Sequence, residues 1–268
     1  MTIIPLSILD LIIAASLVLL LAIASFGFRL SIEKQLIVSG IRTVIQLSLI
    51  GYVLKFLFQE EKLIWISIMA VIMVVAGGRE VAARQKYQLK GQWNFAMGTS
   101  ALFISSFTIA IFALNLIINT SPWYKPQYAI PLLGMLLGNT MTGIALAMNH
   151  FIQNTVQQRT IIEQRLLLGQ SGSEAISDIR KESMKTGLIP SINSMATVGL
   201  VSLPGMMTGQ ILAGNSPVDA VKYQILIMFL ICGGTGFGIM LSVSLTARHI
   251  FDSRHRLKIT RLVKEEMP

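Results

Sequence analysis

Long apolar stretches alternate with short polar connections along the whole of this chain. A helix needs about 20 consecutive apolar residues to cross the hydrocarbon core of a bilayer. Segments that approach or meet this length are the seven at residues 7–28, 39–58, 63–78, 93–118, 128–148, 188–214 and 220–247. Because backbone groups in lipid must be paired within the segment, we predict an all-α, polytopic membrane protein with about seven transmembrane helices.

The sixth predicted span, 188–214, combines high hydrophobicity with polar residues and helix breakers. It contains several glycines and five further residues that a plain membrane anchor does not need: Pro190, Asn193, Ser194, Pro204 and Gln210. Such residues persist at membrane depth mainly where they line a cavity or pack against neighbouring helices. The pattern therefore indicates a component of a transport pathway.

Positive charge is distributed unevenly between the connections. Clusters of Lys and Arg follow the first, third, fifth and seventh spans, whereas the alternate connections carry few basic residues. The positive-inside rule therefore places the N-terminus outside and the C-terminus in the cytoplasm, which fits an odd number of spans. The same distribution accounts for the formal net charge of +9. We therefore expect membrane lipid, and no nucleic acid, as a partner.

Composition excludes several classes of protein. With 53% hydrophobic and 13% charged residues, the chain is far from the balance of a soluble domain. Cys232 is the single cysteine, which excludes an internal disulfide and a Cys-x-x-Cys site. The phosphate-binding pattern Gly-x-x-x-x-Gly-Lys-Ser/Thr is absent, as are His-Glu-x-x-His and Gly-x-Ser-x-Gly. We therefore expect a non-catalytic chain that binds no cofactor of its own.

The longest polar connection, 149–187, has the pattern of two helices rather than of a linker. The first, at 152–168, ends at Gly169, a residue suited to a helix C-cap, and Ser171 with Glu174 forms a capping box that begins the second. Periodicity alone leaves two interpretations open: a turn that projects into the cytosol, or a helix that lies on the membrane surface. In either case, residues 1–268 are expected to form a single transmembrane domain that carries this loop.

Polar groups inside the predicted spans are candidates for lining a substrate pathway, because each needs a partner or water at that depth. The candidates are six polar residues and one helix-breaking proline: Gln46, Asn139, Thr142, Asn193, Ser194, Gln210 and Pro204. Asn139 and Thr142 are three residues apart and share a helix face, which allows pairing between the fifth and sixth spans. The alternative is ordinary hydrogen bonding between helices, typically worth about 0.6 kcal/mol.

Glycines, methionines and histidines add weaker indications. Close helix packing, expected mainly within the subunit, is indicated by three pairs of glycines four residues apart: Gly134 with Gly138, Gly205 with Gly209, and Gly234 with Gly238. Methionines in the fifth and sixth spans are expected to fill apolar gaps rather than to bind metal. The histidines fall at cytoplasmic ends of spans or beyond, at His150, His249 and His255. No metal ligand is therefore assigned.

Several longer motifs carry a resemblance to a known family. Glu-x-Arg-Leu-Leu-Leu-Gly at 163–169, followed by Ser-Glu-Ala at 173–175 and Ile-Pro at 189–190, resembles the ATPase-docking loop of permease subunits of ATP-binding-cassette (ABC) transporters. Over essentially its full length, the chain is similar to the FetB-like iron-export permeases, a family that also includes plant half-permeases linked to aluminium tolerance. The matching stretches are 42–46, 83–85, 130–143, 189–193 and 204–214.

The resemblance implies partners and a cargo. A separate cytoplasmic ABC ATPase would hold ATP and Mg, and the permease would act as a homodimer. The cargo exported across the cytoplasmic (inner) membrane would be iron or a related metal. The residues that the resemblance places at the ATPase-docking turn and beside it are Glu163, Arg165, Gly169, Ser171, Glu174 and Ala175.

Two alternative functions are kept beside this one. The first is an ABC permease for a different small substrate, and the second is a secondary transporter driven by an ion gradient. A secondary transporter normally carries acids or histidines at membrane depth, whereas Asp10 is the only carboxylate in a well-defined span. We therefore expect a permease that depends on a separate ATPase.

Overall fold

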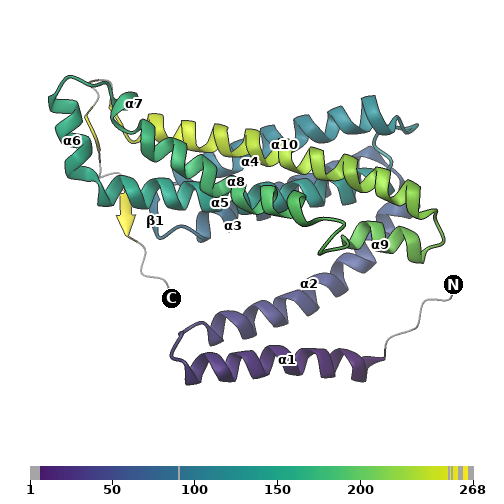
Figure 1. Ribbon diagram of the computed structural model, residues 1–268. Helices are drawn as coiled ribbons and strands as arrows, with labels where there is room; N and C mark the ends of the chain where they lie inside the picture. Colours follow the sequence, from purple (N-terminus) through teal and green to yellow (C-terminus); the bar gives the residue numbers. More distant parts are fainter. Residues whose placement is uncertain (1–6, 90, 253, 255, 259–261, 265–268) are drawn as a thin grey trace. The chain divides into compact units, whose positions relative to one another are not determined.

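The computed structural model (Figure 1) describes residues 7–89, 91–252, 254, 256–258 and 262–264. Its elements, in chain order, are α1 (Ile8–Gly27), α2 (Glu33–Glu60), α3 (Leu63–Ala83), β1 (Tyr87–Leu89), α4 (Trp93–Phe112), η1 (Ala113–Ile118), α5 (Pro126–Gln157), α6 (Arg159–Leu167), α7 (Gly172–Ala175), α8 (Ser177–Thr197), α9 (Gly205–Leu212), α10 (Pro217–His249) and β2 (Leu262–Lys264). The two short strands pair antiparallel. Among the described residues, six helices are long and apolar enough to cross a membrane. The predicted helical, polytopic fold class is thereby confirmed.

Helices α1 and α2 belong to the first of two compact units, which covers residues 1–62 together with 212–214. A capping box begins α1: the Asp10 N–H donates to the Ser7 hydroxyl at 3.3 Å, and the Ser7 N–H donates to the Asp10 carboxylate at 2.8 Å. A short turn then leads into α2, and the two helices pack against each other. Most of their apolar side chains are exposed within this unit, as expected of helices in contact with lipid.

The second unit, residues 63–211 with 215–268, is a bundle built around the two long helices α5 and α10. Each begins with a proline. Proline lacks an N–H, and this costs nothing in the first helical turn, because the N–H groups there have no partner within the helix. Helix α4 packs against both, α3 covers α4 and α5, and α8 lies along α5 and α10. The core contains the fully buried Leu136, Ile144 and Met148 of α5 together with Ile239 and Val243 of α10.

Gly238, one member of the third glycine pair, lies where α10 approaches α4 and α5. A Cβ atom at Gly238 would lie 2.7 Å from Cγ2 of Thr140 and 2.8 Å from Oγ of Ser105, closer than real Cβ atoms approach their neighbours. This contact confirms the prediction that the pair packs within the subunit. At Gly205 and Gly209, by contrast, a Cβ atom would meet nothing within 4 Å, so the second pair marks no close packing in the described structure.

The prediction of one continuous span at 188–214 is wrong. Helix α8 ends at Thr197, and the short helix α9 follows only after an irregular connection at 198–204. Gly199 has a left-handed φ of +83°, and Pro204 both lacks an N–H and disfavours helical geometry in the residue before it. Helix α8 is not among the six apolar helices, since charged residues fill its first turns. The total of seven spans and the orientation of the termini stay predictions.

The loop predicted at 149–187 is helical but is divided differently. Helix α5 runs through its start, because no helix breaker separates the span from the first residues of the loop, and α6 begins only after Gln158. Helix α6 ends before Gly169, whose left-handed φ of +90° suits the predicted C-cap. The capping box is confirmed: the Ser171 N–H donates to Oε2 of Glu174 at 2.8 Å, and the Glu174 N–H donates back to the Ser171 hydroxyl at 3.4 Å.

Candidate functional site

Asn139 and Thr142 lie on one side of α5, as their spacing predicts. The Asn139 side-chain N–H donates to the Met135 carbonyl at 2.8 Å, and the Thr142 hydroxyl donates to the Gly138 carbonyl at 3.0 Å. Asn139 is exposed and Thr142 is half-buried, whereas the opposite side of α5 is buried in the bundle. A polar face on a central helix is therefore open to a ligand or to another chain.

Asn193 and Ser194 form a second polar position, near the C-terminal end of α8. Both are exposed, while Ser191 one turn away is buried. Because α8 packs along α5, two neighbouring helices each present open polar residues. Within the described part of the chain, no hydrogen bond joins Asn139 or Thr142 to this pair. The pairing between the two helices that the sequence allows is therefore not formed within one subunit.

The other three pathway candidates lie on separate elements. Gln46 is exposed on α2, in the first unit. Pro204 precedes α9, and its carbonyl accepts a hydrogen bond from the Thr208 hydroxyl at 2.7 Å. Gln210 is half-buried on α9, and its buried Oε1 has no hydrogen-bond partner among the described residues. An unpaired buried oxygen costs free energy, so we expect water, a ligand or another chain to pair with it.

Arg165 holds the loop between α6 and α8 in a defined shape. Its Nη1 donates to the Ala175 carbonyl at 3.1 Å, and its Nη2 donates to Oδ2 of Asp178 at 3.0 Å. Ala175 itself is fully buried. Glu163, by contrast, pairs with Arg159 of its own helix at 2.7 Å. Of these predicted docking residues, Arg165 and Ala175 therefore shape the turn from within, and Asp178 is a partner that sequence reasoning missed.

The tip of the turn combines a stable cap with exposed apolar side chains. Leu167 and Leu168 are 87% and 84% exposed, and a Cβ atom at the adjacent Gly169 would meet nothing within 4 Å. Beside them, the hydroxyl and the N–H of Ser171 both donate to the Glu174 carboxylate and lower its pKa. The sequence did not mark the two leucines as surface residues, because a leucine run near a helix end is equally typical of a core.

The two histidines that the structure describes, His150 and His249, make contacts in different places. Nδ1 of His150 lies 3.0 Å from the Ser183 hydroxyl, a contact that joins α5 to α8. His249 stacks on Trp93 with ring centroids 4.7 Å apart, and His255 lies outside the described residues. Among the residues that the structure describes, no three His, Cys, Asp or Glu side chains are placed to hold a metal ion. No residue is therefore assigned as a metal ligand.

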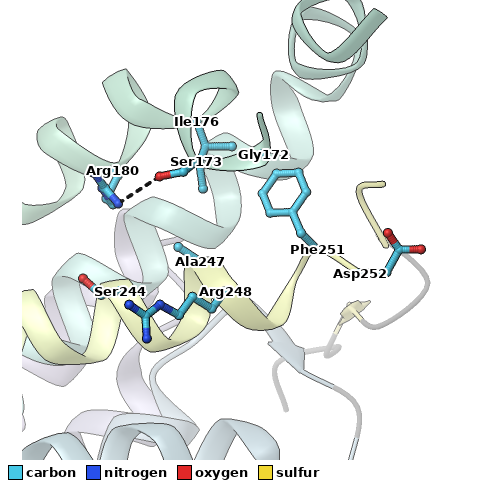
Figure 2. A pocket seen from close by; sticks show the side chains of 9 residues that line it. All are labelled: Gly172, Ser173, Ile176, Arg180, Ser244, Ala247, Arg248, Phe251 and Asp252. Atoms are coloured by element: carbon cyan, nitrogen blue, oxygen red, sulfur yellow. Dashed lines mark hydrogen bonds between the residues drawn. The ribbon is translucent and has the colours of Figure 1, made fainter. Parts of the chain in front are cut away.

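A cavity of about 450 Å³ lies between α7, the first turns of α8 and the end of α10 (Figure 2). The polar side chains that line it are Ser173, Arg180, Ser244, Arg248 and Asp252. Nη1 of Arg180 donates to the Ser173 hydroxyl at 3.5 Å. No sequence motif marks this cavity, because its walls come from two segments that are far apart along the chain.

The chain resembles known membrane proteins over most of its length. Residues 8–251 match the family described as "Uncharacterised protein family (UPF0014)". "Probable iron export permease protein FetB" of Escherichia coli (strain K12) is 33% identical over 262 residues, which cover 94% of this chain and 95% of the relative. "Protein ALUMINUM SENSITIVE 3" of Arabidopsis thaliana is 34% identical over 245 residues, with 91% and 88% covered. No solved structure matches the chain.

A further relative, "UPF0014 membrane protein slr1647" of Synechocystis, is 39% identical over 206 residues, with 75% of this chain and 77% of the relative covered. The matched region extends from the first residue of α1 to beyond the end of α10. It therefore includes the polar faces, the predicted docking turn and most of the cavity lining. The resemblance inferred from the sequence motifs is confirmed, and the chain belongs to the UPF0014 family of multi-pass membrane proteins.

Proposed function

We propose that this chain is the permease subunit of an ABC exporter, with iron or a related metal as cargo and a separate ATPase in the cytoplasm. The family supports the coarser statement, that the chain is a membrane permease, since one relative is named an iron export permease. One structural observation supports the part of the proposal that concerns coupling to an ATPase. Helix α8 runs without a break from the docking turn to the exposed polar residues Asn193 and Ser194.

The length and attachment of α8 suit it to transmit motion. Its 21 residues, at a rise of 1.5 Å each, extend for about 31 Å, close to the thickness of the hydrocarbon core. Its first turn is tied to α6 by the Asp178–Arg165 ion pair at 3.0 Å. Further along, Ser183 contacts α5 through His150. A displacement at the turn is therefore carried along α8 to Asn193.

The turn supplies a surface for the ATPase. Leu167 and Leu168 are large apolar side chains exposed on a polar connection, and such surfaces commonly mark protein contacts. The bonds of Arg165 hold the turn in one shape before binding, which lowers the entropic cost of association. ATP and Mg would be held by the partner, because this chain lacks the phosphate-binding loop.

A second copy of the chain would complete the pathway. In lipid, the side-chain amide of Asn193 and the side-chain oxygen of Asn139, whose N–H already donates to the Met135 carbonyl, would lack partners, at a cost in free energy. A homodimer that covers these faces would remove that cost and would enclose a polar route. The complex would then contain two permease and two ATPase subunits.

The cargo rests on relatives rather than on a binding site. The Escherichia coli relative is named for iron export and the Arabidopsis relative for aluminium sensitivity, so an ABC permease for a different small substrate is the second candidate. A secondary transporter is disfavoured on structural grounds. The buried polar side chains among the described residues are Ser, Thr, Asn and Gln, without the buried acids that ion coupling commonly uses.

Affinity purification of the tagged chain in gentle detergent or nanodiscs tests the proposal. Mass spectrometry is expected to find a stoichiometric P-loop ATPase, and the complex is expected to hydrolyse ATP. Candidate metals can then be screened for stimulation of that activity, and transport into vesicles can be compared with ATP and with an ion gradient alone. Transport driven by the gradient, without a co-purifying ATPase, would establish the secondary transporter instead.

A further inference from the structure

Two arginines from different helices line the cavity at the end of α10. Arg180 lies on α8 and Arg248 lies in the last turn of α10, and Figure 2 shows both at the cavity wall. Ser173 of α7 and Ser244 of α10 add hydroxyl groups to the lining. The cavity of about 450 Å³ has the size of a small-molecule site, and its polar lining is dominated by hydrogen-bond donors.

The acidic side chains nearby are already engaged. Asp252, an acid in the lining, accepts from Nε of Arg256 at 2.9 Å and from two backbone N–H groups, and its pKa is lowered to about 2. Asp178 pairs with Arg165 at 3.0 Å. Within the described part of the chain, no carboxylate pairs with Arg180 or Arg248. The charged residues of the lining are therefore two arginines without a carboxylate partner among the described residues and one aspartate that is already paired, which favours an anion over a cation as ligand.

The position of the cavity along α10 corresponds to a membrane interface. Helix α10 has 33 residues and extends for about 50 Å, so at least one end must leave a hydrocarbon core of about 30 Å. His249, next to Arg248, stacks on Trp93, and tryptophan is enriched at the level of lipid headgroups. Phe251 and Ala247 give the cavity an apolar portion beside its polar wall.

We propose that this cavity binds a phosphate-bearing anion between Arg180 and Arg248. Planar guanidinium groups pair with phosphate oxygens through two parallel hydrogen bonds, and the serine hydroxyls add further donors. Basic pockets between membrane helices hold the headgroups of anionic lipids by the same chemistry. The phosphate group is the shared ligand, whether an anionic phospholipid or free phosphate supplies it. The cavity borders the predicted docking turn through Gly172 and Ser173 of α7, so ATPase co-purification is measured beside the response to anions.

Thermal melting of the purified full-length chain in detergent, after lipid depletion, tests this site. The probes are phosphatidylglycerol in mixed micelles, phosphatidylcholine as a neutral lipid, and inorganic phosphate. Phosphatidylglycerol or phosphate is expected to raise the Tm of the wild type, whereas phosphatidylcholine is not. Arg180→Gln and Arg248→Gln are each expected to raise the apparent Kd about tenfold, because each removes a charge-assisted hydrogen-bonding group. About ten times more ligand should then be needed for the same rise in Tm.

Control variants distinguish specific binding in the cavity from a nonspecific effect of positive charge on the surface. Arg254→Gln removes an exposed arginine near the cavity that does not line it, and this variant is expected to respond like the wild type. Arg248→Lys keeps the charge but loses the planar fork, and should respond at an intermediate level even if Arg248→Gln fails to fold. A response to phosphate alone assigns free anion, and a response only to phosphatidylglycerol assigns lipid.

Two results would overturn the proposal. One is a response that Arg254→Gln loses as fully as Arg248→Gln, which would indicate only the overall positive charge. The other is no response of the wild type to either probe. If Arg248→Gln then also failed to co-purify the ATPase, the cavity would be part of a protein contact instead.

Discussion

Gly187 of α8 lies directly against Gly143 of α5. A Cβ atom at Gly187 would be 2.7 Å from the Gly143 carbonyl oxygen and 2.8 Å from Cβ of Ala147. The two helices therefore cross with their backbones almost in contact, an approach that only small residues permit. This crossing joins the helix that follows the predicted docking turn to the central helix that carries Asn139.

A larger side chain at Gly187 is expected to separate the two helices. Gly187→Val should lower the free energy of unfolding by about 1–3 kcal/mol through overpacking and should reduce ATP-driven transport. Thermal melting and vesicle transport provide the measurements. Gly233→Ala on α10 is the matched control, because a Cβ atom there would meet nothing within 4 Å. Equal melting temperatures for both variants would contradict the close crossing.

The exposed leucine pair at the turn is expected to act in ATPase binding rather than in folding. Leu167→Ser with Leu168→Ser should weaken ATPase co-purification by more than about tenfold, since burying a leucine contributes about 1.5–3 kcal/mol. The melting temperature should change little. The control is Leu200→Ser with Val201→Ser, which alters side chains that are 89% and 83% exposed beyond the other end of α8. The docking assignment fails if both double variants bind equally well.

Arg165 is expected to pre-shape the docking turn. Arg165→Gln breaks the bonds to Ala175 and Asp178, so association with the ATPase should fall several-fold while the bundle stays folded. Arg159→Gln is the control, since it removes an arginine whose 2.7 Å ion pair lies within α6 alone. Quantitative pull-down with a melting curve measures both properties. An unchanged affinity for Arg165→Gln would show that the turn does not need this clamp.

The open asparagines are expected to serve transport rather than stability. Asn139→Ala and Asn193→Ala should each reduce transport severalfold with little change in Tm, because both side chains are exposed in the subunit. Asn115→Ala is matched to Asn139→Ala: Asn115 is exposed, and its side-chain N–H donates to the Ile111 carbonyl four residues back at 3.0 Å. Transport lost equally in all three variants would remove the pathway assignment.

The capping box at the turn is expected to weaken at acid pH. The hydroxyl and N–H of Ser171 lower the pKa of Glu174 below 4.5, so the cap contributes stability above the unfolded pKa and loses it as pH falls through the folded pKa. Hydrogen exchange of residues 172–175, corrected for intrinsic rates, should therefore show lower protection below about pH 4.5. Glu174→Gln should abolish this pH dependence, and a variant that keeps it would exclude Glu174 as the titrating group.

The apolar pattern located most of the long helices, but the helices extend beyond the limits of the apolar segments. The third span was predicted to end at residue 78, where charged residues begin, yet α3 continues to Ala83. The second was predicted from residue 39, yet α2 begins at Glu33. Helical hydrogen bonding does not require apolar side chains, so a hydropathy limit marks where lipid contact ends rather than where the helix ends.

Local chemistry determined the fold class, the capping box at Ser171 and Glu174, the C-cap at Gly169 and the polar residues of α5 and α8. Propensity, periodicity and short-range hydrogen bonds depend on neighbours in the chain, and the sequence contains these directly. Tertiary structure alone decided that Gly187 meets Gly143 and that Arg180 and Arg248 share a cavity. These features depend on which distant surfaces fit together, and no local pattern of residues encodes that fit.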